Sequence, residues 1–102
     1  MVKLIGRTKI NCAVFISGRG TNLKSIFKYS KTIKSKIDLK LVISNNYNIL
    51  GVEFSKKNKI NTKIIDYKKL KHAEDHIIKH LRKYNIKLIC LAGFMKILSN
   101  DF

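Results

Sequence analysis

Residues 11–23 read Asn-Cys-Ala-Val-Phe-Ile-Ser-Gly-Arg-Gly-Thr-Asn-Leu and combine three local signals in one short segment. Residues 12–17 form a mostly apolar run with the length of a buried strand. The glycines of residues 18–20 follow at once, and glycine lets a backbone turn sharply and approach a ligand closely. A helical pattern then starts at Thr21 and Asn22. This order predicts an anion-binding turn, because the first amides of a helix lack intrahelical partners and the helix dipole is positive there.

The rest of the chain alternates short apolar runs with helical patterns. Further strands are predicted at 39–44, 62–65 and 88–91, and helices at 22–30, 51–58 and 69–84. Continuous apolar strands separated by helices indicate an α/β fold with a parallel sheet covered on both faces. Ligands of such sheets bind outside the carboxyl ends of the strands. The segments after the first and fourth strands are therefore the candidate functional loops.

Length and composition indicate one small domain. The chain has 102 residues, which allow a single core. Residues 1–10 read as a basic N-terminal lead and residues 11–102 as the folded domain. No apolar run is long enough to cross a bilayer, and the start lacks the apolar segment of a signal peptide. We therefore expect a cytoplasmic protein.

The net charge of +16 first suggests a nucleic-acid-binding protein. However, all but three of the 22 basic residues are lysines, and they are spread along the chain rather than clustered. No aromatic and basic residues interleave, and no helix-turn-helix or zinc spacing is present. The charge favours anionic ligands in general, through long-range attraction. A phosphorylated small molecule fits it better than DNA or RNA.

Two other readings of the glycine turn fit the sequence less well. A dinucleotide site needs a small residue where Leu23 stands, and an acidic residue at the end of the second strand, whereas Asp38 lies at its start. A P-loop needs a Gly-Lys-Ser or Gly-Lys-Thr ending, which is absent. A tight strand-to-helix turn with no ligand remains an alternative from this segment alone.

Histidines and cysteines give no clear metal or catalytic pattern. His72, His76 and His80 are four residues apart along the long helix, a spacing at which two histidines can chelate zinc. With no acidic or cysteine partner placed to complete a site, we interpret them as a solvated helix edge and expect no metal. Cys12 and Cys90 fall within predicted core strands and are interpreted as small buried hydrophobic residues.

Residues 16–23 and 91–99, read together, resemble the phosphoribosylglycinamide formyltransferases of purine biosynthesis. The second segment reads Leu-Ala-Gly-Phe-Met-Lys-Ile-Leu-Ser. Residues 42–45 and the glycine at 51 also resemble that family at similar spacing. The resemblance implies a Rossmann-like fold corresponding to the N-terminal half of the formyltransferase fold. It implies formyl transfer from 10-formyltetrahydrofolate to glycinamide ribonucleotide.

The resemblance also implies roles for particular residues. By match to the family, the phosphate of glycinamide ribonucleotide is bound by Gly20, Thr21 and Asn22. The folate pocket is lined, largely through backbone groups, by Met95, Lys96, Ile97 and Leu98. The family has an arginine near the start of the long helix that contacts the folate. Lys71 is the nearest residue here, and we assign it no such role because lysine lacks the planar guanidinium fork.

The family's catalytic residues have no counterpart in these residues. By resemblance, a catalytic Asn and His follow the Leu-Ser segment, and a catalytic Asp comes later, in proteins of roughly twice this length. We therefore expect little or no transferase activity from this chain alone. We also expect its part of the formyltransferase sheet to be covered either by a complementing C-terminal half or by self-association. The alternatives are a non-catalytic phosphate-binding or nucleotide-binding remnant and, less favoured, a nucleic-acid binder.

Overall fold

The computed structural model describes residues 9–16, 21–45, 50–65 and 70–92, in which strands and helices alternate. The elements are β1 (Ile10–Ile16), α1 (Thr21–Ser30), β2 (Ile37–Ser44), α2 (Leu50–Lys57), β3 (Asn61–Ile64), α3 (Leu70–Lys83) and β4 (Leu88–Ala92). The described ends of these elements lie within two residues of the predicted ones. The predicted order of strands and helices is confirmed.

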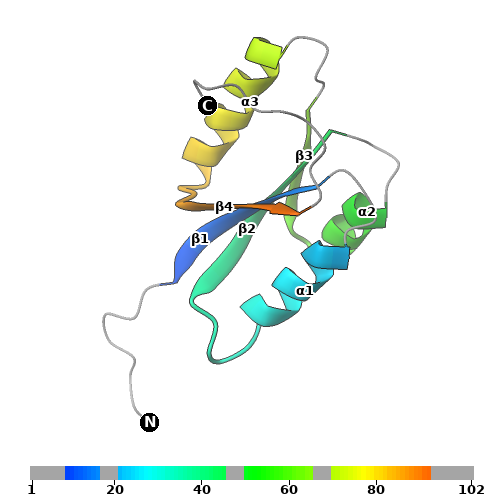
Figure 1. Ribbon diagram of the computed structural model, residues 1–102, viewed down its shortest axis with the longest axis vertical. Helices are drawn as coiled ribbons and strands as arrows, with labels where there is room; N and C mark the ends of the chain where they lie inside the picture. The colour runs from blue at the N-terminus through cyan, green and yellow to red at the C-terminus, as the bar shows by residue number, and fades with distance from the viewer. Residues whose placement is uncertain (1–8, 17–20, 46–49, 66–69, 93–102) are drawn as a thin grey trace.

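The strands form one parallel sheet in the order β3-β2-β1-β4. The chain moves outward from β1 to β2 and β3, and then crosses back to place β4 on the other side of β1. Because right-handed crossovers in opposite directions use opposite faces of a sheet, α1 and α2 cover one face and α3 covers the other (Figure 1). This is the predicted α/β architecture.

β1 is the centre of the core. Its residues 12–16 are all fully buried, and they alternate between the two faces of the sheet. Ala13 and Phe15 pack with Ile77 under α3. Cys12, Val14 and Ile16 pack on the α1 and α2 side. A strand that is buried on both faces needs apolar residues at every position, which explains the unbroken apolar run at the start of the chain.

An irregularity in β2 at Lys40 was not predicted. Cys12 pairs with Leu39 while the next residue, Ala13, pairs with Leu41, so Lys40 is an extra residue in the strand. A bulge of this kind shifts the alternation of side chains by one position. Leu39 therefore packs on the α1 and α2 side, whereas Leu41 packs under α3.

α2 and α3 end in the same way, with a residue in the left-handed conformation. These residues are Lys59, with a φ of 59°, and Asn85, with a φ of 54°. After α2, the Ile60 N–H donates to the Ser55 carbonyl and the Lys59 N–H donates to the Lys56 carbonyl, both at 3.0 Å. This pair of bonds is the Schellman motif, whose left-handed position is most often glycine.

Replacing Lys59 with glycine should therefore stabilise the fold. Glycine removes the clash of the Cβ atom at positive φ, and part of that gain is offset by the greater freedom of glycine in the unfolded chain. We expect the free energy of unfolding to rise by about 0.5–1 kcal/mol, measured by urea denaturation at neutral pH. Asn85→Gly is the control and should gain less, since asparagine tolerates this conformation. A Lys59→Gly protein no more stable than the wild type would contradict this explanation.

Candidate functional site

The four strands end together at one edge of the sheet. Ile16 at the end of β1 is in register with Ser44 of β2 on one side and with Ala92 of β4 on the other. Ser44 is in turn in register with Ile64 at the end of β3. This carboxyl edge is where parallel α/β sheets bind ligands.

The strand order reverses between β1 and β4, at the pair formed by Ile16 and Ala92. Helices that follow strands on the two sides of such a switch point diverge to opposite faces, which leaves room for a ligand. In the sequence, the glycine turn begins two residues after Ile16, and the predicted folate segment begins three residues after Ala92. The two strand ends that precede the candidate segments are therefore neighbours in the sheet.

The amino end of α1 lies in this region of the fold. α1 begins at Thr21, whose side chain is exposed like that of Asn22, while Leu23 is buried against β1 and β2. The first turn contains no acidic side chain that would compete for the free amides. Its positive dipole end therefore remains suited to an anion.

Only part of the predicted site falls within the described residues. Thr21 and Asn22 do so, at the start of α1. Gly20, which was predicted to bind phosphate, lies outside the described residues, and so does the whole predicted folate segment: Met95, Lys96, Ile97 and Leu98. Lys71 is an exposed residue in the first turn of α3.

The described strand ends carry no carboxylate and no histidine. They are Ile16, Ser44, Ile64 and Ala92. Asp38 lies at the opposite, amino edge of the sheet, where its carboxylate is 3.1 Å from the Lys40 ammonium. Glu53 lies on α2 and is exposed. Groups suited to proton transfer are thus not presented by the described strand ends at the carboxyl edge.

Glu74 is a buried acidic residue that the sequence analysis did not single out. It lies on α3 and is only 5% exposed. The signal was present in the sequence, because Leu70, Glu74, Ile77 and Leu81 are spaced by four, three and four residues. That spacing puts Glu74 on the face of the helix that packs on the sheet.

Cys12 and Cys90 are free thiols that lie close together. Cys12 is buried, as predicted, whereas Cys90 is only partly buried, which differs from the prediction. Their sulfur atoms are 3.7 Å apart. Burial, together with the neighbouring Cys90, raises the pKa of Cys12 to about 12. At neutral pH such a thiol is protonated and unreactive, so Cys12 has a packing role.

His80 lies on α3 and is partly buried. Within the described residues its Nδ1 atom is buried without a hydrogen-bond partner. Burial lowers the pKa of His80 below its ordinary value of 6.5, and Lys63, Lys83 and Lys79 lower it further, followed by His76. No three His, Cys, Asp or Glu side chains gather in a metal-binding arrangement in the described parts of the chain.

The lowered pKa of His80 makes stability depend on pH. Between the lowered pKa and 6.5 the unfolded state binds more protons than the folded state, so stability falls as the pH falls through this window. When the pH is lowered from 7.5 to 5, the wild type should lose more stability than His80→Gln, which has no imidazole to protonate. Thermal unfolding of both proteins at the two pH values measures this, and an unchanged difference would exclude the explanation.

The fold and the edge geometry define a class of protein. A parallel α/β sheet with a free helix amino end beside its switch point is typical of enzymes that bind phosphorylated ligands. Among the described helices, none is long and apolar enough to span a bilayer.

Residues 10–102 match the family model described as formyl transferase, and the chain belongs to that family. A trifunctional purine biosynthetic protein adenosine-3 from Gallus gallus is 36% identical over 101 residues, which are 96% of this chain and 10% of that protein. The phosphoribosylglycinamide formyltransferase of Escherichia coli (strain K12) is 33% identical over 91% of this chain and 45% of its own length. The resemblance drawn from residues 16–23 and 91–99 is confirmed.

The solved structures agree with the fold prediction. The phosphoribosylglycinamide formyltransferase from Anaplasma phagocytophilum superposes with a TM-score of 0.84 at 36% identity, over 92% of this chain and 44% of that one. The chain thus spans about a tenth of the trifunctional relatives and about half of the single-function ones. Its fold is that of part of a formyltransferase.

Proposed function

We propose that this chain takes part in the transfer of a formyl group from 10-formyltetrahydrofolate to the amino group of glycinamide ribonucleotide. The observation that carries the proposal is the pairing of Ile16 with Ala92 at the switch point, with the exposed amino end of α1 beside it. Membership of the formyl transferase family supplies the reaction type. We propose a cytoplasmic location on the sequence argument alone.

In this proposal the two predicted segments have different tasks. Gly20, Thr21 and Asn22 hold the phosphate through backbone amides and short polar side chains at a positive helix end. Met95, Lys96, Ile97 and Leu98 line the pocket for the folate. The pairing of β1 with β4 supports this division, because the two segments follow strand ends, Ile16 and Ala92, that are neighbours in the sheet. Positioning the two substrates side by side is then the contribution of this chain to the reaction.

The chemical step needs further groups. When the amine attacks the formyl carbon, a proton must be moved and a tetrahedral oxyanion stabilised. The described strand ends offer neither a carboxylate nor a histidine for these tasks. We propose that these 102 residues bind glycinamide ribonucleotide but convert it at a negligible rate on their own.

Two measurements on the purified chain test these proposals. Calorimetry with glycinamide ribonucleotide should show saturable binding, and a turnover assay with both substrates should show almost no product. Unchanged binding in the Asn22→Ala variant would contradict the predicted phosphate site. A normal turnover rate would overturn the proposed lack of catalysis. Binding without turnover also fits the alternative function, a non-catalytic phosphate-binding or nucleotide-binding protein.

We propose that further polypeptide pairs with β4 in the active protein. In the described part of the chain β4 is an edge strand, yet its sequence Leu-Ile-Cys-Leu-Ala is the continuous apolar run of an interior strand. Leu88 and Leu91 are 39% and 59% exposed. An unpaired apolar edge of this kind favours pairing with another chain. The net charge of +16 opposes a second copy, so the occupant we favour is a complementing segment.

Complementation tests that proposal. The partner to add is the part of the Escherichia coli (strain K12) phosphoribosylglycinamide formyltransferase that this chain does not match. Together the two polypeptides should regain transferase activity that neither has alone, and Leu91→Lys should abolish the gain. Sedimentation of the chain by itself distinguishes the other case, since a stable dimer would favour a second copy as the occupant.

A further inference from the structure

Two exposed histidines, His72 and His76, form a pair on α3, the helix that covers the face of the sheet opposite α1 and α2 (Figure 1). The centroids of their imidazole rings are 4.5 Å apart, and the ring planes are tilted by 49°. Residues four apart on a helix are neighbours on its surface. Their spacing alone led us to expect no metal, and the structure adds the arrangement of the two rings.

The distance between the rings suits two imidazoles bound side by side to one metal ion. A nitrogen–metal distance of about 2.0–2.1 Å puts the centre of an imidazole ring about 3.2 Å from the ion. Two rings bound at a right angle then have centroids about 4.5 Å apart, whereas the wider tetrahedral angle requires about 5.2 Å. The observed 4.5 Å matches the right angle. Right angles are typical of Ni²⁺ and Cu²⁺, whose coordination is tetragonal or square-planar.

The helix holds this pair in place without a metal. The residues that directly follow the two histidines, Ala73 and Ile77, are buried against the sheet and fix α3 on it. The backbone therefore keeps the two histidines one turn apart. Their side chains are exposed, which leaves space for water as further ligands. Chelation thus requires little ordering beyond the side-chain torsions, and preorganised ligands bind more tightly.

The local charge around the pair differs from the charge of the whole chain. The chain carries a net charge of +16, which opposes the binding of a cation. Residues 71–79, however, contain two lysines and two acidic residues, Lys71, Glu74, Asp75 and Lys79, and are neutral in sum. More distant exposed charges are screened at physiological ionic strength. The electrostatic cost of a cation is therefore small at this point of the surface.

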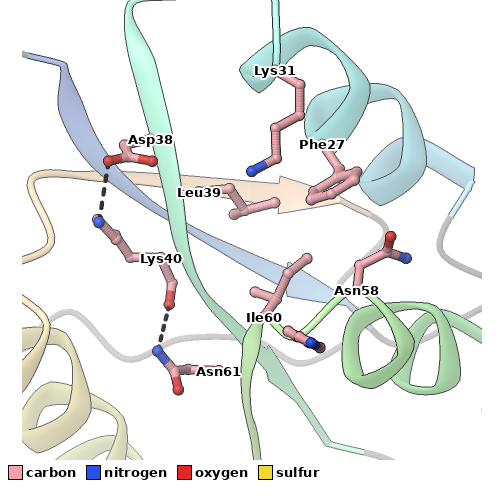
Figure 2. Close-up of a pocket in the computed structure, with 9 residues that line it drawn as sticks. Phe27, Lys31, Asp38, Leu39, Lys40, Asn58, Ile60 and Asn61 are labelled. Carbon is pink, nitrogen blue, oxygen red and sulfur yellow. Dashed lines mark hydrogen bonds and ion pairs between the residues drawn. The ribbon is translucent and has the colours of Figure 1, made fainter.

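Other groups that could bind such an ion are less well placed in the part of the chain that the structure describes. Asp38 is already paired with the Lys40 ammonium at 3.1 Å (Figure 2). The Cys12 thiol is fully buried, and burial raises its pKa to about 12. No group of three His, Cys, Asp or Glu side chains is found in these ranges. The histidine pair is therefore a two-ligand site whose remaining positions are filled by water.

We propose that His72 and His76 chelate a divalent transition-metal ion of the Ni²⁺ and Cu²⁺ type. Protons compete with the metal for both imidazoles, so binding weakens in acid. The unfolded chain does not hold the two histidines one turn apart, so the metal binds the folded protein more tightly and stabilises it. The proposal does not depend on formyl transfer, because no substrate takes part in it.

Nickel chloride is the probe, added at pH 7.5 to the protein without a histidine tag. Paramagnetic Ni²⁺ should broaden the NMR signals of residues 72–76 first. The midpoint of urea denaturation should rise with the Ni²⁺ concentration and return to its starting value when EDTA is added. His76→Gln changes an exposed residue and should weaken Ni²⁺ binding by about tenfold or more, because a chelate becomes a single contact.

His80→Gln is the matched control. It removes a histidine one turn further along α3 and leaves the pair of rings intact. The rise of the midpoint with Ni²⁺ should therefore persist in His80→Gln and be lost in both His72→Gln and His76→Gln. Equal losses in all three variants would mean that single histidines bind the ion, which overturns the proposal. A midpoint that does not rise at millimolar Ni²⁺, or broadening confined to residues outside 72–76, also overturns it.

Discussion

Asn22→Asp should abolish binding of glycinamide ribonucleotide while making the fold more stable. The substitution puts a carboxylate at the exposed amino end of α1, where the proposed site holds a phosphate. A negative charge near a helix amino end stabilises the protein by about 0.3–1 kcal/mol. The same charge repels the phosphate at short range, so we expect affinity to fall about a hundredfold or more. Calorimetry and urea denaturation measure the two effects separately.

Ser25→Asp is the matched control for this experiment. Ser25 is exposed, lies one turn further along α1 and undergoes the same change of charge. It should weaken binding only slightly, because the effect of a charge on the helix end falls off within the first turn. If both variants lose affinity equally, the attraction comes from the net charge and the proposed phosphate site is wrong. Unchanged affinity in the Asn22→Asp variant would also show that the proposed phosphate site is wrong.

Phe15→Ala should remove most of the stability of the protein. Phe15 lies near the carboxyl end of β1, is fully buried and packs in the cluster under α3. Truncating a buried phenylalanine costs about 3–5 kcal/mol, because transfer energy is lost and a cavity remains. Small domains are stable by only about 5–15 kcal/mol. Urea denaturation should therefore show a large fall of the midpoint or a largely unfolded protein.

The control is the residue opposite Phe15 on the neighbouring strand. Leu91 is in register with Phe15 but is 59% exposed. Leu91→Ala should therefore cost less than about 1 kcal/mol in this chain. If a complementing polypeptide covers β4 as proposed, the same substitution should become costly in the complex. Equal losses for Phe15→Ala and Leu91→Ala in the chain alone would mean that β4 is buried as deeply as β1.

The order of the elements could be predicted from the sequence because each has its own local signal. The apolar run of residues 12–16 and the stripe along α3 do not depend on tertiary context. The position of β4 beside β1 is different. Alternating strands and helices fit several strand orders, and nothing in the residues of β4 selects β1 as its neighbour over β3. The carboxyl edge could be predicted as the location of the candidate segments, whereas the pairing of β1 with β4 was seen only in the structure.

Local departures from regular geometry were also not predictable. Residues 37–44 alternate apolar and polar side chains at first, so they read as one regular strand and conceal the extra residue at Lys40. The ends of α2 and α3 lack the glycine that marks a left-handed residue, since Lys59 and Asn85 occupy those positions. The conformational preferences of single residues do not reveal positions where the fold imposes an unfavourable backbone conformation.

For the candidate site, the structure describes only the helix start at Thr21 and Asn22. Thr21 and Asn22 are exposed at a helix start, as the glycine-turn pattern implied. The roles of Gly20 and of Met95, Lys96, Ile97 and Leu98 stay predictions.

The extra residue in β2 affects how this chain should be aligned and recombined with its relatives. On the two sides of Lys40 the inward and outward positions of the strand are out of phase. A gap-free alignment with a strand of regular pleat would therefore exchange the residues that face α3 with those that face α1 and α2 over half the strand. A chimera that joins this chain to a relative should have its junction after Leu41, where both strands follow the same alternation.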